Sequence, residues 1–103
     1  MIRNDEEPRE LGAIVDALAR QFGVAPHRFF QLICDEWTAL VGVQLAQMCR
    51  PVMVKDHVLV IETPVPGVAE RLNALARELA QRINTLADVE VVREVSVRVV
   101  RPR

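Results

Sequence analysis

The sequence predicts an α+β fold whose elements follow the order α-α-β-β-α-β, with a small three-stranded mixed sheet and helices packed on one face. Three observations predict it. Apolar residues recur at helical spacing before residue 50 and again after residue 66. Two short β-branched runs lie between these segments, and an alternating run follows near the end. At 103 residues, half of them apolar and 26% charged, the chain has the size and composition of one globular domain.

The first predicted helix follows an acidic segment. We expect residues 1–10 to fray and residues 11–101 to form the single domain. The helix is marked by one apolar stripe: Leu11, Val15, Leu18 and Phe22. This spacing places the four side chains on one face, and Gly23 can end the helix. Asp16 and Arg20 are expected to pair on its outer side.

A second helical segment begins at Pro26, which suits a first helical turn. Its apolar positions are Phe30, Ile33, Trp37, Leu40, Val41, Leu45 and Met48. Gly42 interrupts this stripe, so we expect either a bend at Gly42 or two helices placed end to end. The helical pattern should stop before Pro51, because the residue before a proline disfavours the helical conformation.

The period then changes to that of strands. Residues 52–54 and 58–63 are β-branched runs whose spacing predicts an antiparallel hairpin. No glycine stands in the turn between them, so Asp56 or His57 has to adopt a positive φ.

A connector over residues 64–67 precedes the strongest helical stripe in the chain: Val68, Leu72, Leu75, Leu79, Ile83 and Leu86. Glu78 and Arg82 are expected to pair on its outer side. Residues 89–100 then alternate as a strand, with Val92 and Val100 on its less protected face. This strand reaches the hairpin only after the chain crosses through the long helix, which is why we expect a mixed sheet.

The residues that could carry catalysis or bind metal are few. His27 and His57 have no acid or nucleophile at a known motif spacing, and we interpret both as exposed polar turn residues. Cys34 and Cys49 lie in helix-like stretches and are most simply small core residues. No nucleotide-binding or metalloprotease motif occurs. We therefore predict no catalytic residue, no cofactor and no metal, and a protein that is not an enzyme.

Composition also bears on the compartment. The longest uninterrupted apolar run, residues 58–61, has four residues, whereas a membrane span needs about 20. The acidic start lacks the features of a secretory signal, and the two cysteines form no CxxC pair. These features predict a protein of the reducing cytoplasm that has no membrane partner.

Contacts with macromolecules must come from local surfaces, because the formal net charge is only −1. The candidate nucleic-acid contacts are Lys55, Arg71, Arg77, Arg82, Arg98, Arg101 and Arg103. Two interpretations of this set stay open: a solvated mixed surface, since Glu70, Glu78 and Glu90 interleave with it, or a backbone-binding patch. Trp37, the one tryptophan, is either a core residue or a partner anchor.

An ordered series of short motifs spans nearly the whole chain. It comprises Glu36-Trp37-Thr38-Ala39-Leu40-Val41-Gly42, Leu45-Ala46, Pro51, Asp56, Val58-Leu59-Val60 and Arg71-Leu72. In this series the sequence resembles the DciA family of bacterial replicative-helicase loaders. The structural signature residues are Trp37, Val41, Gly42, Pro51, Leu59 and Leu72. Three features depart from the family pattern. His57 stands where the family favours glycine, Val68 stands where many members place a tryptophan ahead of the long helix, and the chain is near neutral where many members are strongly basic.

The resemblance implies a KH-like domain over residues 11–101. It also implies a non-enzymatic protein that binds a DnaB-type replicative helicase and assists its loading on single-stranded DNA, to which the chain itself binds weakly. Two alternatives remain. One is a KH-like module that binds RNA or single-stranded DNA. The other is a protein-interaction domain that associates with itself through its exposed sheet.

Overall fold

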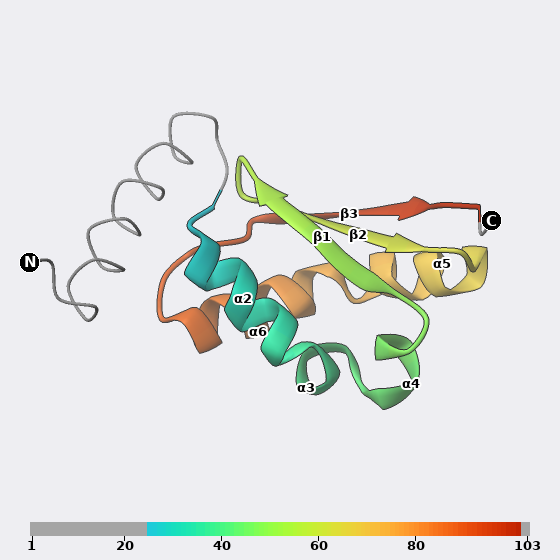
Figure 1. The fold of residues 1–103 in the computed structure, drawn as a ribbon, viewed down its shortest axis with the longest axis horizontal. Coiled ribbons are helices and arrows are strands. Elements are labelled where there is room, and N and C mark those ends of the chain that lie inside the picture. The colour runs from blue at the N-terminus through green and yellow to red at the C-terminus, as the bar shows by residue number, and fades with distance from the viewer. Residues whose placement is uncertain (1–24, 102–103) are drawn as a thin grey trace, which may run out of the picture.

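The computed structural model describes residues 25–101. Its helices are α2 (His27–Asp35), α3 (Trp37–Val41), α4 (Val43–Ala46), α5 (Pro66–Ala74) and α6 (Ala76–Ala87), and its strands are β1 (Arg50–Lys55), β2 (Val58–Thr63) and β3 (Glu94–Val99) (Figure 1). The acidic segment, the helix predicted over residues 11–22 with its Asp16–Arg20 pair, Gly23 and Arg103 lie outside the described residues.

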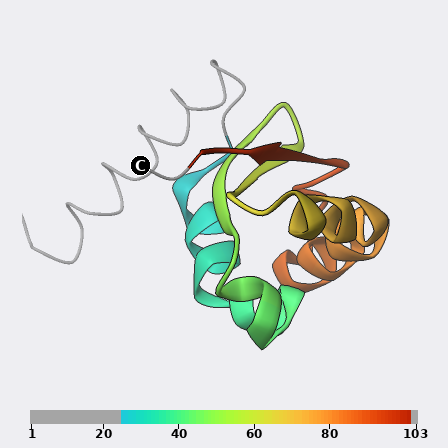
Figure 2. The same ribbon diagram turned by 90° about the vertical axis from the view of Figure 1, so that its right-hand side faces the viewer.

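The three strands form one mixed sheet in the order β1-β2-β3. β1 and β2 are antiparallel, and β2 and β3 are parallel because α5 and α6 carry the chain back between them. The helices lie on one side of the sheet (Figures 1 and 2). Leu59, Ile61 and Thr63 face them and are fully buried, whereas Met53 on the opposite side is 40% exposed. The predicted α+β fold with a mixed sheet is confirmed.

The β1–β2 turn has the left-handed backbone that the sequence requires. Both Asp56 and His57 adopt positive φ, 53° and 64°, as a two-residue turn of this hand demands. His57 also holds the turn to the segment before β3: its carbonyl accepts from the N–H of Arg93 at 2.7 Å, and its Nδ1 lies 3.2 Å from the carbonyl oxygen of Val91. A glycine would relieve the backbone strain but would lose the side-chain contact.

The helices are more interrupted than their stripes predict. Gly42 separates α3 from α4 with φ 93° and ψ 156°, a conformation essentially restricted to glycine, so the expected break there is confirmed. Glu36 separates α2 from α3. The single long helix predicted after residue 67 is wrong in detail, because Leu75, with ψ near 2°, divides it into α5 and α6.

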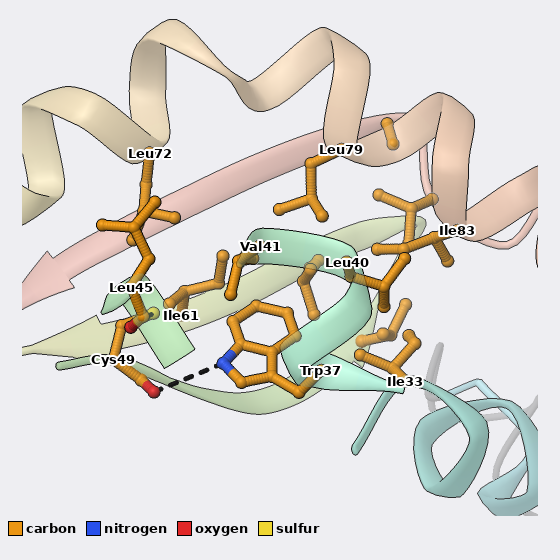
Figure 3. Close-up of a cluster of buried hydrophobic side chains, with 14 of the residues drawn as sticks. Ile33, Trp37, Leu40, Val41, Leu45, Cys49, Ile61, Leu72, Leu79 and Ile83 are labelled. Carbon is orange, nitrogen blue, oxygen red and sulfur yellow. Dashed lines mark hydrogen bonds between the residues drawn. The ribbon is translucent and has the colours of Figure 1, made fainter. Parts of the chain in front are cut away.

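Trp37 lies in the core and is 6% exposed, as the core interpretation predicts. Its indole Nε1–H donates to the carbonyl of Cys49 at 3.3 Å, so the one polar atom of the ring is satisfied (Figure 3). The ring belongs to one cluster of apolar side chains from the helices and the sheet, among them Ile33, Leu40, Val41, Leu45, Ile61, Leu72, Leu79 and Ile83 (Figure 3). One core therefore joins the helices to the inner face of the sheet.

Two burial predictions are wrong. Cys34 is exposed, because its position on α2 lies next to buried Ile33 but off the apolar face. Val92 is only 1% exposed, because the final strand begins at Glu94 and residues 89–93 form a connection that turns into the core.

Asn84, a residue that the sequence patterns do not single out, holds this connection in place. Its Oδ1 accepts from the N–H groups of Val91 and Val92 at 2.8 and 2.9 Å, and its Nδ2 donates to the carbonyl of Val92 at 2.7 Å. These bonds satisfy backbone groups that would otherwise be buried without a partner.

Candidate macromolecular interface

The side chains capable of catalysis or metal binding are dispersed over the part of the chain that the structure describes. Within residues 25–101, no group of three or more His, Cys, Asp or Glu is placed to hold a metal ion. His27 lies exposed in the first turn of α2, and His57 lies in the β1–β2 turn. The structure does not bring these two histidines together with the cysteines.

The two thiols are free and poorly ionised. Partial desolvation of the Cys34 thiol, reinforced by the carboxylate of Asp35, raises the pKa of Cys34, although the residue is exposed. Burial also raises the pKa of Cys49, against a smaller opposing effect of Trp37. Because the thiolate is the reactive form, both cysteines are weak nucleophiles at neutral pH. Cys49 is therefore a buried structural residue, whereas Cys34 is an exposed thiol.

A hollow of about 560 Å³ lies at the end of the molecule that carries the β1–β2 turn. It is bounded by the start of α2, the turn and the connection before β3, and Phe29, Val54 and Val91 contribute to an apolar wall. Arg28 stands at its edge with its guanidinium 4.7 Å from the Phe29 ring centroid. An apolar wall with charged groups beside it suits contact with another apolar group.

The face of the sheet away from the helices, here called the outer face, carries a charged row. Arg50 on β1, Glu62 on β2 and Arg98 on β3 are consecutive cross-strand neighbours. The guanidinium of Arg50 lies 3.1 Å from the carboxylate of Glu62. Since Glu62 already pairs with Arg50, the row carries an excess of one positive charge at its β3 end.

The remainder of the outer face is more apolar. Met53, Val60 and Ser96 form the next row, and Lys55, Val58 and Glu94 form the row beside the turn. A β-bulge between Pro51 and Met53 makes Val52 the extra residue of β1. The outer face thus has an apolar centre bordered by charged groups at both ends, an arrangement common in protein contact surfaces.

The predicted cationic residues are distributed over both layers of the molecule. Lys55 and Arg98 are on the outer face but on opposite edge strands, and four positions along the strand direction alone separate them by about 13 Å. The others within residues 25–101 are Arg71 on α5, Arg77 and Arg82 on α6, and Arg101 after β3. The structure therefore does not gather them into one patch. Arg50, which the sequence analysis does not select, is the cation that the fold brings closest in register to Arg98.

Arg82 has a structural role in the helical layer. Its Nη1 donates to the carbonyl of Leu40 at 2.9 Å, and its Nη2 donates to Glu78 at 3.0 Å. The first bond holds α6 to α3, and the second is the outer pair predicted from the sequence. A guanidinium engaged in this way has fewer donors to offer to a phosphate.

The signature residues of the sequence resemblance mark the scaffold of the fold. Trp37, Val41, Leu59 and Leu72 are buried. Gly42 provides the break between α3 and α4, and Pro51 lies at the bulge of β1. The four buried side chains therefore serve the packing of the fold and are not accessible to a partner.

Comparison with known proteins agrees with the motif series. Residues 10–97 match the family described as "Dna[CI] antecedent, DciA". The chain is 26% identical over 91 residues to UPF0232 proteins of Mycobacterium tuberculosis and Mycobacterium bovis, covering 88% of this chain and 49% of theirs. It is 24% identical over 94 residues to a UPF0232 protein of Rhodococcus jostii, covering 91% and 50%.

The chain thus spans about half the length of the curated relatives it matches. None of the helices described among residues 25–101 has the length and apolar character needed to cross a membrane. The family match extends over most of the sequence and includes every signature residue. The chain belongs to the DciA family.

Proposed function

We propose that this chain is a non-enzymatic accessory protein of bacterial DNA replication. It acts in the cytoplasm, binds a DnaB-type replicative helicase, and assists the loading of that helicase on single-stranded DNA. The observation that carries the proposal is membership of the DciA family over residues 10–97. The KH-like character of the domain is part of the same proposal.

A loader can act without a nucleotide site of its own. If it binds one state of the helicase ring more tightly than another, it shifts the ring toward that state, and the ring performs the ATP chemistry. This chain has no nucleotide-binding motif. Such a mechanism requires only a binding surface whose affinity differs between the two states.

The outer face of the sheet is the surface that we assign to the helicase. Met53 is 40% exposed, and Val58 and Val60 beside it are half-buried. The helices described within residues 25–101 lie on the other side of the sheet (Figure 1). Arg50 and Lys55 border this apolar centre. An apolar centre excludes water in a complex, and the charged border selects the partner and its orientation.

Single-stranded DNA is the weaker partner in this proposal. Lys55 and Arg98 share the outer face, but Glu62 and Glu94 lie in the same rows. Few phosphates can be neutralised there, so affinity should fall only gently with salt.

The test is a titration of the chain against its cognate hexameric helicase, with and without a single-stranded oligonucleotide. Met53→Asp places a charge in the apolar centre and should weaken helicase binding at least tenfold. Thr85→Asp, an exposed change on α6, is the matched control and should leave binding unchanged. If the wild-type chain does not associate with the helicase, the proposed function is contradicted. If both variants weaken binding equally, the assignment of the outer face is contradicted.

The second candidate function is a KH-like module that binds RNA or single-stranded DNA as its main partner. The observation in its favour is the positive end of the outer face at Arg98. It predicts affinity that falls steeply with salt and is abolished by Arg98→Glu. A gentle salt dependence with intact helicase binding would exclude it.

A further inference from the structure

β3 is an edge strand whose outward backbone groups have no strand beside them within residues 25–101. The N–H of Glu94 donates to His57 at 3.2 Å, and that of Val100 donates to Thr63 at 2.9 Å. Residues with these even numbers therefore direct their backbone polar groups toward β2. Backbone groups alternate in direction along a strand, so Val95, Val97 and Val99 direct theirs toward the open edge.

The side chains of β3 are complementary to a second copy of the same strand. Suppose that two copies meet antiparallel, with Ser96 of each on the two-fold axis. Glu94 of one copy then lies opposite Arg98 of the other, and Val95 lies opposite Val97. Both Glu94–Arg98 contacts form at once, because a two-fold axis repeats every contact.

The backbone directions agree with this register. Val95 and Val97 both face the open edge, so they form the hydrogen-bonded pairs of the new ladder. Glu94, Ser96 and Arg98 occupy its non-hydrogen-bonded positions, where opposing side chains come closest. The Glu94–Arg98 ion pair therefore falls where cross-strand contacts are shortest.

Neighbouring registers lose this complementarity. With Val97 on the axis, Glu94 faces Val100 and Ser96 faces Arg98. With Val95 on the axis, Glu94 faces Ser96. Only the register centred on Ser96 matches the two opposite charges. Within residues 25–101 neither Glu94 nor Arg98 has an ion-pair partner, and Glu62 beside Arg98 is paired with Arg50.

We propose that two copies of this chain associate through β3, antiparallel about Ser96, to form one continuous six-stranded sheet from two three-stranded sheets. The exposed side chain of Val99, 51% accessible, is partly covered in this arrangement. The proposal does not rest on the helicase-loading function, because it is argued from the outward backbone groups of β3 and from the opposite charges of Glu94 and Arg98, although these two side chains also lie on the outer face.

The first experiment locates the axis by cross-linking. Ser96→Cys in a Cys34→Ser background should form an intermolecular disulfide under mild oxidation, because the two Cα atoms lie about 4.5 Å apart on the axis, inside the range of about 4.4–6.8 Å that disulfides span. Glu94→Cys in the same background is the control. It lies on the same exposed strand, but its two copies are far apart in this register. Equal cross-linking of both variants would overturn the register.

The second experiment exchanges the charges. Glu94→Arg or Arg98→Glu places like charges opposite one another and should weaken dimerisation at least tenfold in sedimentation velocity, whereas the double variant should restore it. Circular dichroism confirms that each variant is folded. A wild-type chain that stays monomeric at millimolar concentration overturns the proposal. If β3 variants reduce helicase binding in such a monomer, the helicase rather than a second copy occupies this edge.

Discussion

β1 and β3 are both edge strands of the described sheet, but further strand pairing is blocked at β1 and not at β3. On β1, the N–H of Ala25 donates to the carbonyl of Val54 at 3.0 Å, Pro51 has no N–H to offer, and a bulge at Val52 interrupts the ladder. β3 has an unbroken register with β2 and neither a proline nor a bulge. Bulges, prolines and covering segments are ways in which proteins block unwanted pairing at an edge. β1 is therefore a closed edge.

β3 does carry charged side chains, which also discourage edge pairing in many proteins. Here, however, Glu94 and Arg98 have opposite signs and stand symmetrically about Ser96. Charges arranged in this way oppose most partner strands but favour a second antiparallel copy. The comparison shows that an edge is closed or open according to the pattern of its charges as well as their number.

The largest expected loss of stability comes from a substitution in the core beside β1, the closed edge. Trp37→Ala should lower the free energy of unfolding by about 3–5 kcal/mol, because it empties a core site and removes the hydrogen bond to Cys49, which directly precedes β1. Urea denaturation measures the change. Trp37→Phe retains part of the ring packing and should cost less. Unchanged stability in Trp37→Ala would mean that the ring does not support β1.

The next largest loss of stability is expected at the connection that precedes β3, the open edge. Asn84→Ala removes three hydrogen bonds to Val91 and Val92 and should cost about 2–3 kcal/mol. Hydrogen exchange should show that the substitution speeds the exchange of the β3 amides more than that of the β1 amides, each compared with the wild-type chain. Gln81→Ala, exposed on the same helix, is the control. A loss of protection spread evenly over all three strands would contradict a local role for Asn84.

A proline scan sharpens the contrast between the two sides of β3. Arg98→Pro removes an N–H that is directed toward β2 and should cost about 1–2 kcal/mol. Val99→Pro removes an outward N–H and should change stability by less, while still weakening dimerisation. Thermal melting with sedimentation velocity separates the two outcomes. The reverse order of stabilities would show that the backbone directions are assigned incorrectly.

The smallest effect depends on pH at the start of β1. Burial raises the pKa of Cys49 above its ordinary value of 9.0, so the folded state retains the thiol proton more firmly than the unfolded state. This contribution is complete below about pH 9 and is lost as pH rises through the folded-state pKa. In a Cys34→Ser background, the Cys49→Ala variant should therefore lose less stability between about pH 8 and about pH 10 than the parent that keeps Cys49. If urea denaturation gives the same loss for the parent and for the Cys49→Ala variant, the contribution assigned to the Cys49 thiol is contradicted.

Much of the fold follows from local patterns in the sequence. The two β-branched runs leave only Lys55, Asp56 and His57 for the hairpin turn, and both Asp56 and His57 adopt the required positive φ. β2 occupies the predicted residues Val58–Thr63. Gly42 ends α3 because its backbone conformation is not open to other residues. In each case the information lies within a few neighbouring residues.

The rest depends on contacts that local periodicity does not encode. Val92 continues the alternation of the final strand, but bonds from Asn84 on α6 draw it into the core. The cationic residues are spread because each amphipathic element directs its own polar face outward. Arg82 and Arg98 therefore lie on different layers. Arg50 becomes relevant only through its cross-strand pairing with Glu62.

The parallel pairing of β2 with β3 has a consequence during synthesis. A hairpin forms within about 1–10 µs, but the start of β3 is translated 31 residues after the end of β2. At about 5–20 residues per second, the nascent chain spends seconds with the hairpin complete and the β3 side of β2 vacant. During that interval β2 can accept β3 from a neighbouring chain. Crowded polysomes should therefore favour strand-exchanged dimers that dilute refolding would avoid.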